Sequence, residues 1–536
     1  MALSVDGLVS GLDTTTIISQ LMDLERRPVT LLQNKQTTLA DQKAAWQEVN
    51  SRLLKFETAA NAINTADEFA SRSASFSSNN TSGGSVLSVT AGSNTSEGTY
   101  NVAVSQIARA QKSASNEAFS SYTSAAGASG TISINGSYNI TVSASDTLEE
   151  IKNNINSSGA PVTASIINTG TSSSPQYKLI LSASDTGTAN SFTASDITNL
   201  TFATTQAAQD AQFTIDGVSV TKSSNTVTDV IYDATINLET TGSGAVTFST
   251  DYNSIVDKVK TFVGAYNDVM DYIKEQFTYN QNTNEKGALF GNATLEMIQE
   301  QVRSVMTNSV PGIDATDTSN LAYLSQVGLK TDEENHLVVN ETTFKDLLKT
   351  RFDDVKNLFV TSGSGTYTFT SATGKTQGGV YDTRVVDAGG GTAALEMRLQ
   401  GSSGSWIRLT QNGNFALGQS GSDLEGLILR TGTLSVGDPD GSMKIAIGAA
   451  ERISVKAGSF TEFSTDGLIF NQYQSIEKQD KDIQSQIDDL DQRITKKEED
   501  LKTKFANLET LLSKLTSQQN YLNSQLGTLS QNWKRA

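Results

Sequence analysis

The stretch IDDLDQRITKKEEDLKTKFANLETLLSKLTSQQNYLNSQLGTL, residues 487–529, has the clearest periodic pattern in the chain. Apolar side chains recur in it at every seventh position: Ile487, Ile494, Leu501, Leu508, Leu515, Leu522 and Leu529. A seven-residue repeat keeps these side chains on one stripe of an α-helix and is typical of a coiled coil. The sequence therefore predicts a C-terminal helix over about residues 473–533, roughly 90 Å long at 1.5 Å per residue.

The companion apolar positions of this helix change along its length. Ile483 and Leu490 lie four residues before their partners in the repeat, whereas Phe505, Leu512 and Leu526 lie four residues after theirs. The apolar stripe must therefore rotate around the helix, and one partner surface cannot cover all of it. We expect one packing environment in the first part of the helix and a different one in the last part. Apolar surface that a chain does not cover itself usually marks an assembly contact.

The N-terminal part of the chain predicts two further helices. Asp13 offers an N-cap ahead of Ile17, apolar residues follow at Leu21 and Leu24, and Pro28 is expected to interrupt the helix. A second helix is expected after the proline, because a step of seven residues joins Leu32, Leu39, Trp46 and Leu53.

A third heptad segment lies in mid-chain and should pack beside the terminal helices. Its apolar positions are spaced by three and four residues: Val256, Val259, Val263, Tyr266, Met270, Ile273 and Phe277. Two shorter helices are predicted over residues 292–309, which Pro311 follows, and over residues 343–359.

Between about residues 76 and 250 the apolar pattern has a period of two, which favours β-strands. An internal repeat occurs here, since residues 130–142 match residues 211–220 in sequence. The two copies contain Asn135-Gly136 and Asp216-Gly217 at the same place. These dipeptides favour type I′ turns, which need positive φ at both central positions. Each copy is therefore predicted to be a small β-hairpin.

The predicted fold is a multidomain α+β protein, in which N-terminal, mid-chain and C-terminal helices form a coiled-coil or helical-bundle domain with inserted β-rich domains. A late β-rich stretch has its own turn signals and is interpreted as an extra insertion. The expected domains are terminal helices, 1–42 and 500–536; a helical bundle, 43–75, 251–360 and 465–499; a β-rich domain, 76–128 and 212–250; a second β-rich domain, 129–211; and an extra inserted β-rich domain, 361–464.

The length and composition of the chain argue against several protein classes. With 536 residues the chain is too long for one core, since single cores stop growing near about 250–300 residues. Its 40 Lys and Arg against 58 Asp and Glu give a net charge of -18, which disfavours nucleic acid as a partner. Because the chain has no Cys, it has no disulfides and no thiolate metal sites. It has no long apolar run, so neither membrane insertion nor a cleaved export signal is expected.

Few residues could carry catalysis or hold a cofactor. The single histidine, His336, lies in a polar turn and is interpreted as a solvated residue, which excludes a histidine triad or a histidine metal cluster. Gly374-Lys375-Thr376 resembles the end of a phosphate-binding loop, but Phe369 stands where the first glycine is required. Asp314 and Asp317 are paired carboxylates in predicted turns, and solvated charge is the simpler interpretation. We therefore expect no enzyme activity, no catalytic residues, no metal and no cofactor.

Residues 5–22, VDGLVSGLDTTTIISQLM, and Glu25-Arg26-Arg27-Pro28 resemble the start of the flagellar filament capping protein family, also called FliD or hook-associated protein 2. The Asn135-Gly136 and Asp216-Gly217 modules look like the small β-inserts of flagellin-related proteins. Five later segments agree with the family in the same order: residues 262–269, 287–295, 324–329, 355–359 and 505–526. The resemblance covers residues 1–360 and 465–536 and leaves out residues 361–464.

This resemblance implies a structural cap at the distal tip of the bacterial flagellar filament, which promotes flagellin polymerisation and prevents flagellin leakage. It implies a homo-oligomeric ring whose terminal helices are legs on the distal end of the filament or the hook junction. Flagellin and an export chaperone are the implied partners, with no nucleic acid and no membrane insertion. The implied location is extracellular, reached by type III export without a cleaved signal peptide. The residues expected to contact the filament or other copies are Leu8, Leu12, Ile17, Leu21, Leu508, Leu515, Leu522, Leu526 and Leu529.

Two other functions stay open from the residues alone. One is another tip or junction component of a flagellar or type III apparatus with an adhesin role, or flagellin itself, although residues 7–28 argue against flagellin. The other is an adhesin or carbohydrate-active protein built on the β-rich domains.

Overall fold

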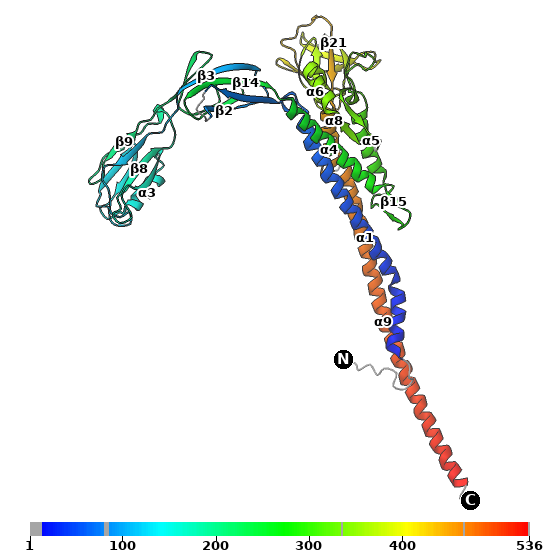
Figure 1. Ribbon diagram of the computed structural model, residues 1–536. Coiled ribbons are helices and arrows are strands. Elements are labelled where there is room, and N and C mark those ends of the chain that lie inside the picture. Colours follow the sequence, from blue (N-terminus) through cyan, green and yellow to red (C-terminus); the bar gives the residue numbers. More distant parts are fainter. Residues whose placement is uncertain (1–12, 80–84, 334–335, 465–466, 534–536) are drawn as a thin grey trace. The chain divides into compact units, whose positions relative to one another are not determined.

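The computed structural model of the chain describes residues 13–79, 85–333, 336–464 and 467–533, and Figure 1 shows its helices and strands. The chain divides into two compact units, Met1–Asn64 with Lys258–Ala536, and Thr65–Asp257. The first unit therefore joins both ends of the chain to its second half, while the second unit is a single continuous stretch.

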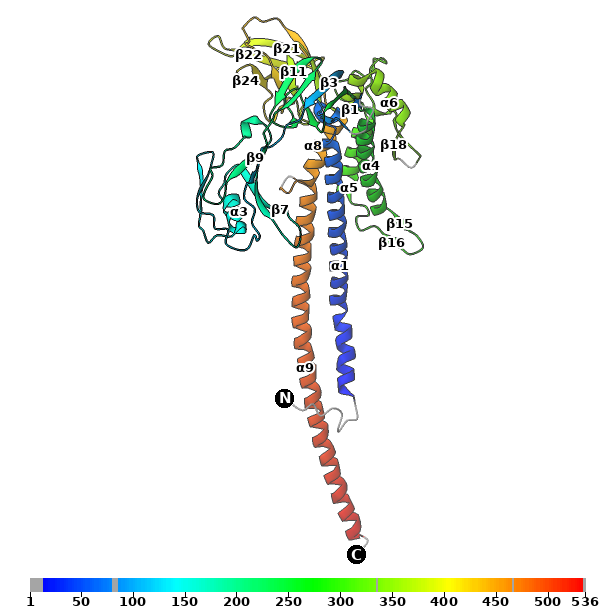
Figure 2. The ribbon, with the colours of Figure 1, turned by 60° about the vertical axis from the view of Figure 1, so that its left-hand side comes forward.

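The first unit contains two long helices that lie side by side, α1 (Thr14–Asn61) and α9 (Leu468–Trp533) (Figure 2). The predicted N-cap is confirmed, because the Asp13 Oδ1 accepts a hydrogen bond from the Thr16 N–H at 2.9 Å. The predicted heptad positions Leu39, Trp46 and Leu53 of α1 are buried. The expected long C-terminal helix is confirmed as well.

α1 is one continuous helix, so the expected break at Pro28 is wrong. A proline inside a helix removes one backbone hydrogen bond, and its ring crowds the carbonyl four residues earlier. Met22 and Val29, on either side of this proline, are each only 5% exposed. Because α1 packs along α9, burial of this face holds the two halves of α1 in one helix despite the missing hydrogen bond.

The mid-chain helices of the first unit agree with the sequence. In α4 (Tyr252–Gln276) the predicted apolar positions Val259, Val263 and Ile273 are buried. The ring of Phe262 in α4 lies 5.2 Å from the ring of Phe56 in α1, measured between centroids. α5 (Ala293–Thr307) matches the helix predicted over residues 292–309.

The helix predicted over residues 343–359 is instead two helices, α6 (Glu341–Thr350) and α7 (Phe352–Phe359). Arg351 leaves the helical region with φ −142° and ψ 47°. Its guanidinium donates to the Asp354 Oδ2 at 2.7 Å and to the Ser319 carbonyl at 2.7 Å. The break turns the chain so that Phe344 of α6 and Phe359 of α7 are both fully buried.

A β-sandwich follows α7. Its strands form a five-stranded sheet in the order β19-β27-β21-β22-β23 and a four-stranded sheet in the order β20-β26-β25-β24. The buried side chains of its core include Tyr381, Leu395, Leu429 and Met443. The strand bounds are Ser362–Gly365 (β19), Thr368–Ser371 (β20), Gly379–Asp387 (β21), Ala393–Leu399 (β22), Ile407–Arg408 (β23), Thr410–Asn412 (β24), Phe415–Leu417 (β25), Ile428–Arg430 (β26) and Gly441–Ala446 (β27).

The β-sandwich ends at Ala446, so the predicted β-rich domain of residues 361–464 is too long. Residues 449–461 form a helix, α8 (Ala449–Thr461), that packs on α1 and α5. Its buried residues are Ala449, Ala450, Ile453, Ala457, Phe460 and Thr461. These apolar residues are spaced by three and four positions, which predicts a helix. The many turn-forming residues just before them concealed this signal in the sequence.

The β-sandwich leaves and rejoins the helical part of the first unit at one place. A Cβ atom added to Gly448 would lie 2.1 Å from the Phe359 carbonyl carbon and 2.4 Å from the Val360 nitrogen. The backbone that enters the sandwich therefore touches the backbone that leaves it, and position 448 has no room for a side chain.

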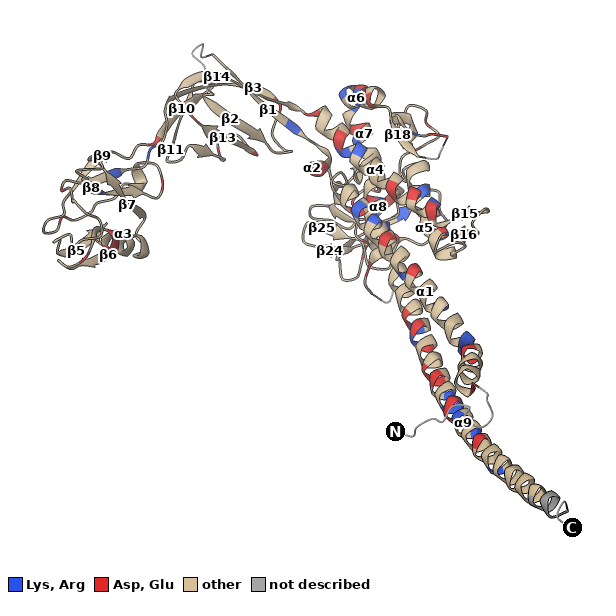
Figure 3. Ribbon diagram, turned by 60° about the horizontal axis from the view of Figure 1, so that its bottom comes forward, with Lys and Arg blue, Asp and Glu red and all other residues tan. Residues whose placement is uncertain are grey.

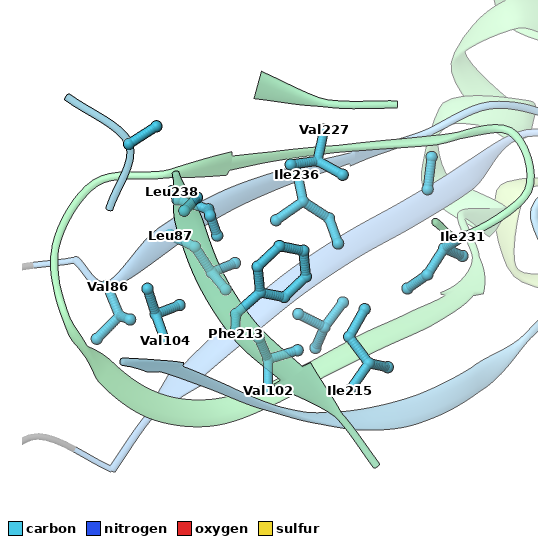
Figure 4. Close-up of a cluster of buried hydrophobic side chains, with 14 of the residues drawn as sticks. Val86, Leu87, Val102, Val104, Phe213, Ile215, Val227, Ile231, Ile236 and Leu238 are labelled. Carbon is cyan, nitrogen blue, oxygen red and sulfur yellow. The ribbon is translucent and has the colours of Figure 1, made fainter. Parts of the chain in front are cut away.

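The second unit contains two β-rich cores. The first has a sheet in the order β1-β14-β3-β10-β11 and a smaller sheet in the order β12-β13-β2. Phe213 lies in the middle of its core among Leu87, Val102 and Ile236 (Figure 4). The strands are Arg72–Ser78 (β1), Leu87–Ala91 (β2), Gly98–Gln106 (β3), Ala211–Ile215 (β10), Val218–Lys222 (β11), Thr226–Val227 (β12), Ala234–Leu238 (β13) and Gly242–Thr250 (β14).

The second core of this unit combines a sheet in the order β7-β8-β4-β9, the hairpin β5-β6 and the helix α3. Strand β4 pairs with β8 and β9, so this core begins near Lys112 and not at residue 129 as predicted. The elements are Lys112–Ser115 (β4), Gly130–Ile134 (β5), Tyr138–Val142 (β6), Leu148–Ser157 (α3), Val162–Asn168 (β7), Tyr177–Ala183 (β8) and Phe202–Gln206 (β9).

Both predicted hairpin turns are confirmed. Asn135 and Gly136 have φ of 53° and 68°, and Asp216 and Gly217 have φ of 47° and 82°. The two copies of the repeat nevertheless lie in different cores, since β5 and β6 belong to the second core and β10 and β11 to the first.

We predict that residues 361–447 can be removed without unfolding the helical part of the first unit. Joining Val360 to Gly448 through one or two glycines should leave its melting temperature nearly unchanged, because these two residues already touch. Deleting residues 361–464 should instead leave the protein insoluble, because that removes α8. Ile453 and Phe460 of α8 are buried and contribute about 1.5–3 kcal/mol each. Equal solubility and equal circular dichroism melts for the two deletions would contradict this boundary.

A substitution in α4 tests its buried face. Val263→Asp places an unpaired carboxylate where the native side chain is 4% exposed, which should cost about 3–5 kcal/mol of unfolding free energy. The matched control is Gly264→Asp, since a Cβ at position 264 has no heavy atom within 4 Å. Urea unfolding should show a lower midpoint for the first variant only. An equal midpoint for both would mean that α4 is not packed as described.

Candidate assembly site

α1 and α9 run antiparallel, and polar contacts along their sides define the register. Lys43 Nζ lies 3.0 Å from Glu477 Oε1, and Gln36 Nε2 lies 3.1 Å from Gln484 Oε1. Lys497 donates to Glu25 nearer the start of α1. Residue numbers on α9 therefore rise as those on α1 fall. These side chains are well exposed, so each contact adds little to stability and chiefly selects one alignment.

The charges of these contacts also lower carboxyl pKa values. The Lys43 ammonium, hydrogen-bonded to Glu477, lowers the pKa of that carboxyl. The Lys502 ammonium, one turn further along α9, does the same to the pKa of Glu498. Both carboxylates are therefore charged at neutral pH, and the paired region of the two helices has charge of both signs along it.

The apolar seam of the pair lies between the two helices. On α9 it consists of the buried residues Ile476, Ile483, Ile487 and Ile494. On α1 the buried positions along the paired length are Ile18, Met22, Val29 and Leu39. Burial of each such side chain stabilises the pair by about 1.5–3 kcal/mol, so this seam and not the ion pairs holds the helices together.

The seven-residue repeat of α9 continues beyond the end of this seam. From the Lys497–Glu25 contact, Thr14 at the start of α1 lies opposite about residue 508 of α9, because antiparallel helices advance equally along their axes. Ile494 is 4% exposed, whereas Leu508 is 41%, Leu515 is 51% and Leu522 is 60% exposed. We call residues 508–533 the α9 tip. Its residues Leu508, Leu515 and Leu522 repeat the spacing of the buried seam but lie on the surface.

The α9 tip also differs from the paired region in charge. Residues 515–533 contain no Lys, Arg, Asp or Glu. Figure 3 shows acidic and basic residues along most of α9 and then a stretch of helix without them toward its end. Within residues 515–533 the leucines therefore have Ser, Thr, Asn and Gln as neighbours in sequence and no charged residue.

The structure places the predicted contact residues as follows. Leu508, Leu515, Leu522 and Leu526 lie on the α9 tip and are exposed, and Leu21 on α1 is 42% exposed. Ile17 is half-buried, because the buried face of α1 is one residue out of phase and runs through Ile18 and Met22. Leu8 and Leu12 lie outside the described residues. Leu529 lies in α9, but its side chain is outside what the structure describes.

A pocket of about 330 Å³ between α1 and α9 was not predicted from the sequence. Phe463, Phe470 and Tyr473 form its apolar wall, with Asn50 and Gln47 of α1 opposite. Burial raises the pKa of Tyr473 to about 12, so its hydroxyl stays protonated. Its aromatic residues are spaced irregularly around a chain connection, which gives no periodic signal in the sequence.

The residues considered for catalysis do not form a reactive site. The ring of His336 ties a turn to α4, since its Nε2 lies 2.6 Å from Asp271 Oδ1. The backbone N–H of His336 donates to Asp332 Oδ1 within the same turn. Asp314 and Asp317 each accept hydrogen bonds from a neighbouring hydroxyl and N–H two residues on, which lowers the pKa of both carboxyls. Each aspartate is thus held in its own turn, with its carboxylate ionised.

Among the described residues, no group of three or more His, Asp or Glu is placed to hold a metal ion. No helix within the described ranges is both long enough and apolar enough to cross a membrane.

Comparison with protein-family models gives three matches. Residues 208–517 match the C-terminal part of flagellar hook-associated protein 2, and residues 10–111 match its N-terminal part. Residues 128–185 match the flagellin hook IN motif. The C-terminal match includes the range of the β-sandwich.

Comparison with curated proteins gives similar results. The chain is 28% identical over 392 residues to flagellar hook-associated protein 2 of Escherichia coli K12, with 67% of this chain and 81% of that protein covered. It is 26% identical over 420 residues to the Campylobacter jejuni protein of the same name, with 67% and 64% covered. Among solved structures, the D1-D2-D3 domains of the flagellar cap protein FliD from Escherichia coli give a TM-score of 0.45 at 28% identity, with 59% of this chain and 88% of that chain covered.

Two substitutions in one heptad stripe test the division of α9 into a paired region and a tip. Ile487→Asp should lower the melting temperature of the subunit, because the native side chain is 5% exposed. Leu522→Asp, at the equivalent position of a later repeat, should leave it unchanged, because that side chain is already 60% exposed. Both are measured in protein dilute enough to be monomeric. A large destabilisation by Leu522→Asp would show that the tip is covered within one subunit.

Proposed function

The chain belongs to the flagellar hook-associated protein 2 family, and on this basis we propose that it is the structural cap at the distal tip of a bacterial flagellar filament. In this role it promotes the polymerisation of flagellin and prevents flagellin from leaking into the medium. The proposal includes export of the chain through the flagellar type III channel to the cell exterior.

One structural observation supports a cap above all. The heptad stripe of α9 is buried up to Ile494 and exposed at Leu508, Leu515 and Leu522. At this end α9 extends beyond its partner helix α1. A stripe of exposed leucines on a monomer marks a contact surface for another protein. A terminal helix that binds its partner only in the assembled cap needs such a stripe, because the stripe must stay uncovered until assembly.

The proposed partners follow from the same surface. A homo-oligomeric ring holds several tips together, and the ring contacts flagellin and the distal end of the filament or the hook junction. An export chaperone would cover the exposed leucines before assembly. The proposed function is structural and not enzymatic, because the candidate acid–base residues lie in separate turns with their carboxylates ionised.

Removal of the α9 tip tests the cap. Cells that carry the chain without residues 509–536 should form short filaments and release flagellin monomer, because the ring loses its attachment while its β-rich domains stay folded. Flagellin in the culture medium is measured by immunoblot. The double variant Leu515→Asp, Leu522→Asp should give the same result with the full length retained.

The matched control is Ser517→Asp, which adds one charge on the opposite side of the same helical turns and should leave the medium free of flagellin. Normal filaments in cells with the truncation would overturn the leg role of the tip. Filaments that are normal when the whole protein is absent would overturn the cap.

A further inference from the structure

One face of the β-sandwich carries a cluster of charged side chains. Along β21 and β22 the core residues alternate with side chains that point outward from the sheet. We call the cluster of outward side chains on β21, β22 and β23, together with a tryptophan just before β23, the arginine face. Its members are Asp382, Arg384, Glu396, Arg398, Trp406 and Arg408. Three guanidiniums and two carboxylates give it a surplus of positive charge, on a chain whose net charge is -18.

The centre of the arginine face is a buried carboxylate. Glu396 is only 7% exposed, and each of its oxygens accepts from a different guanidinium. Arg384 donates to Oε2 through Nε and Nη2, at 3.1 and 2.7 Å. Arg408 donates to Oε1 through the same two atoms, at 3.2 and 3.0 Å. The cost of desolvating such a group offsets most of its attraction, so it adds little to stability. Its effect is to hold two guanidiniums in fixed orientations.

Trp406 holds arginines of this face from a second side. The Cζ atom of Arg384 lies 4.2 Å from the centroid of the Trp406 ring, and the Cζ atom of Arg398 lies 4.6 Å from it. Both distances are in the range of a cation–π contact. The guanidinium of Arg398 also lies 3.7 Å from the Asp382 carboxylate. Arginines that are already held in place lose little side-chain entropy when a ligand binds.

The guanidiniums keep hydrogen-bond donors for a ligand. The side chains of Arg384, Arg398 and Arg408 are 38%, 35% and 47% exposed. Glu396 takes Nε and Nη2 of two of them, and within the described chain the Nη1 of neither Arg384 nor Arg408 has a hydrogen-bond partner. A guanidinium fork matches the oxygens of a carboxylate or a phosphate-like anion. The arginine face is therefore prepared to bind several anionic groups at once.

The polar character of this face indicates which kind of polyanion fits it. A protein partner needs a mostly apolar centre in its interface. The strands β21, β22 and β23 are described throughout, and none of their large apolar side chains is exposed. The ring of Trp406 is itself in contact with two guanidiniums. A polymer of sugars is polar along its whole length and needs no apolar centre, so an acidic polysaccharide fits this face better than an acidic protein does.

We propose that the arginine face binds an acidic polysaccharide, whose carboxylate or sulfate groups accept hydrogen bonds from Arg384, Arg398 and Arg408. Glu396 and Trp406 are positioning residues, which hold the guanidiniums in place. This binding goes beyond the proposed cap, since it lies on the β-sandwich and requires neither an oligomer nor flagellin.

Dextran sulfate, carboxymethyl dextran and unmodified dextran share one backbone and differ in charge, so they test the ligand class on the purified full-length chain. Calorimetric titration at low salt should show binding of both acidic dextrans and none of unmodified dextran, and added salt should weaken the binding. Poly-glutamate of similar length is the polypeptide probe and should bind more weakly. Failure of both acidic dextrans to bind would overturn the proposal. Equal or tighter binding of poly-glutamate would also overturn it and would indicate an acidic protein as the partner.

Variants test the site itself. Arg408→Gln should weaken dextran sulfate binding by about tenfold or more, because it removes hydrogen bonds to charged groups. The matched control is Arg430→Gln, which removes the same charge from an exposed position of β26 in the other sheet and should leave the affinity nearly unchanged. Arg408→Lys keeps the charge without the planar fork, so it should bind nearly as weakly as Arg408→Gln.

The fold of these variants is checked by circular dichroism melts. Arg384 still pairs with Glu396 when Arg408 is replaced, so the melting temperature should not change. If it does fall, Arg398→Gln takes the place of Arg408→Gln, because it leaves both guanidinium contacts of Glu396 intact. An equal loss of binding in Arg430→Gln, or full binding by Arg408→Lys, would show that net charge alone attracts the polymer and would overturn the site.

Discussion

The unequal length of two paired helices is the constraint on which the rest of the first unit depends. α1 has 48 residues and α9 has 66, and a single antiparallel alignment places the start of α1 opposite about residue 508, well before the end of α9. Burial of isoleucines between the helices holds them together, while the exposed ion pairs reject other alignments. Because α1 begins at Thr14, the turns of α9 beyond about residue 508 have no part of α1 opposite them, and Leu515, Leu522 and Leu526 are exposed there. The candidate site therefore arises from helix length and register, and no special side-chain chemistry is required.

This arrangement also explains why the chain places its β-rich parts where it does. The helical domain needs segments from both ends and the middle of the sequence, so every other segment is an insertion whose two ends return to that domain. The second unit is one such insertion, with two cores of its own, and the β-sandwich is another. Each insertion buries its own apolar residues, which is why its sequence can change without disturbing the seam between α1 and α9.

Much of this organisation was predictable from the sequence, because periodicity reports burial directly. The heptads at Ile487 and Ile494 and the turns at Asn135 and Asp216 were predicted correctly, since a buried stripe and a positive φ each restrict the residue type. Errors occurred where tertiary contacts outweighed local preference. Packing on α9 carries α1 through Pro28, and two hydrogen bonds from Arg351 break a helix that the apolar spacing predicted as one. The contact residues of the tip were predicted as a stripe, but how far α1 covers that stripe depends on a register that only the structure reveals.

The touching backbones at Val360 and Gly448 have a consequence for how the chain folds. In sequence, α7 and α8 are separated by the whole β-sandwich, and closing so long a loop slows the formation of contacts between them. If the sandwich folds first, its ends are already adjacent, and the helices then meet as though a short turn joined them. The sandwich is a local module that can be complete before α8 and α9 join the helical domain. The helical domain can then be completed when α8 and α9 pack onto α1, which precedes both of them in the chain.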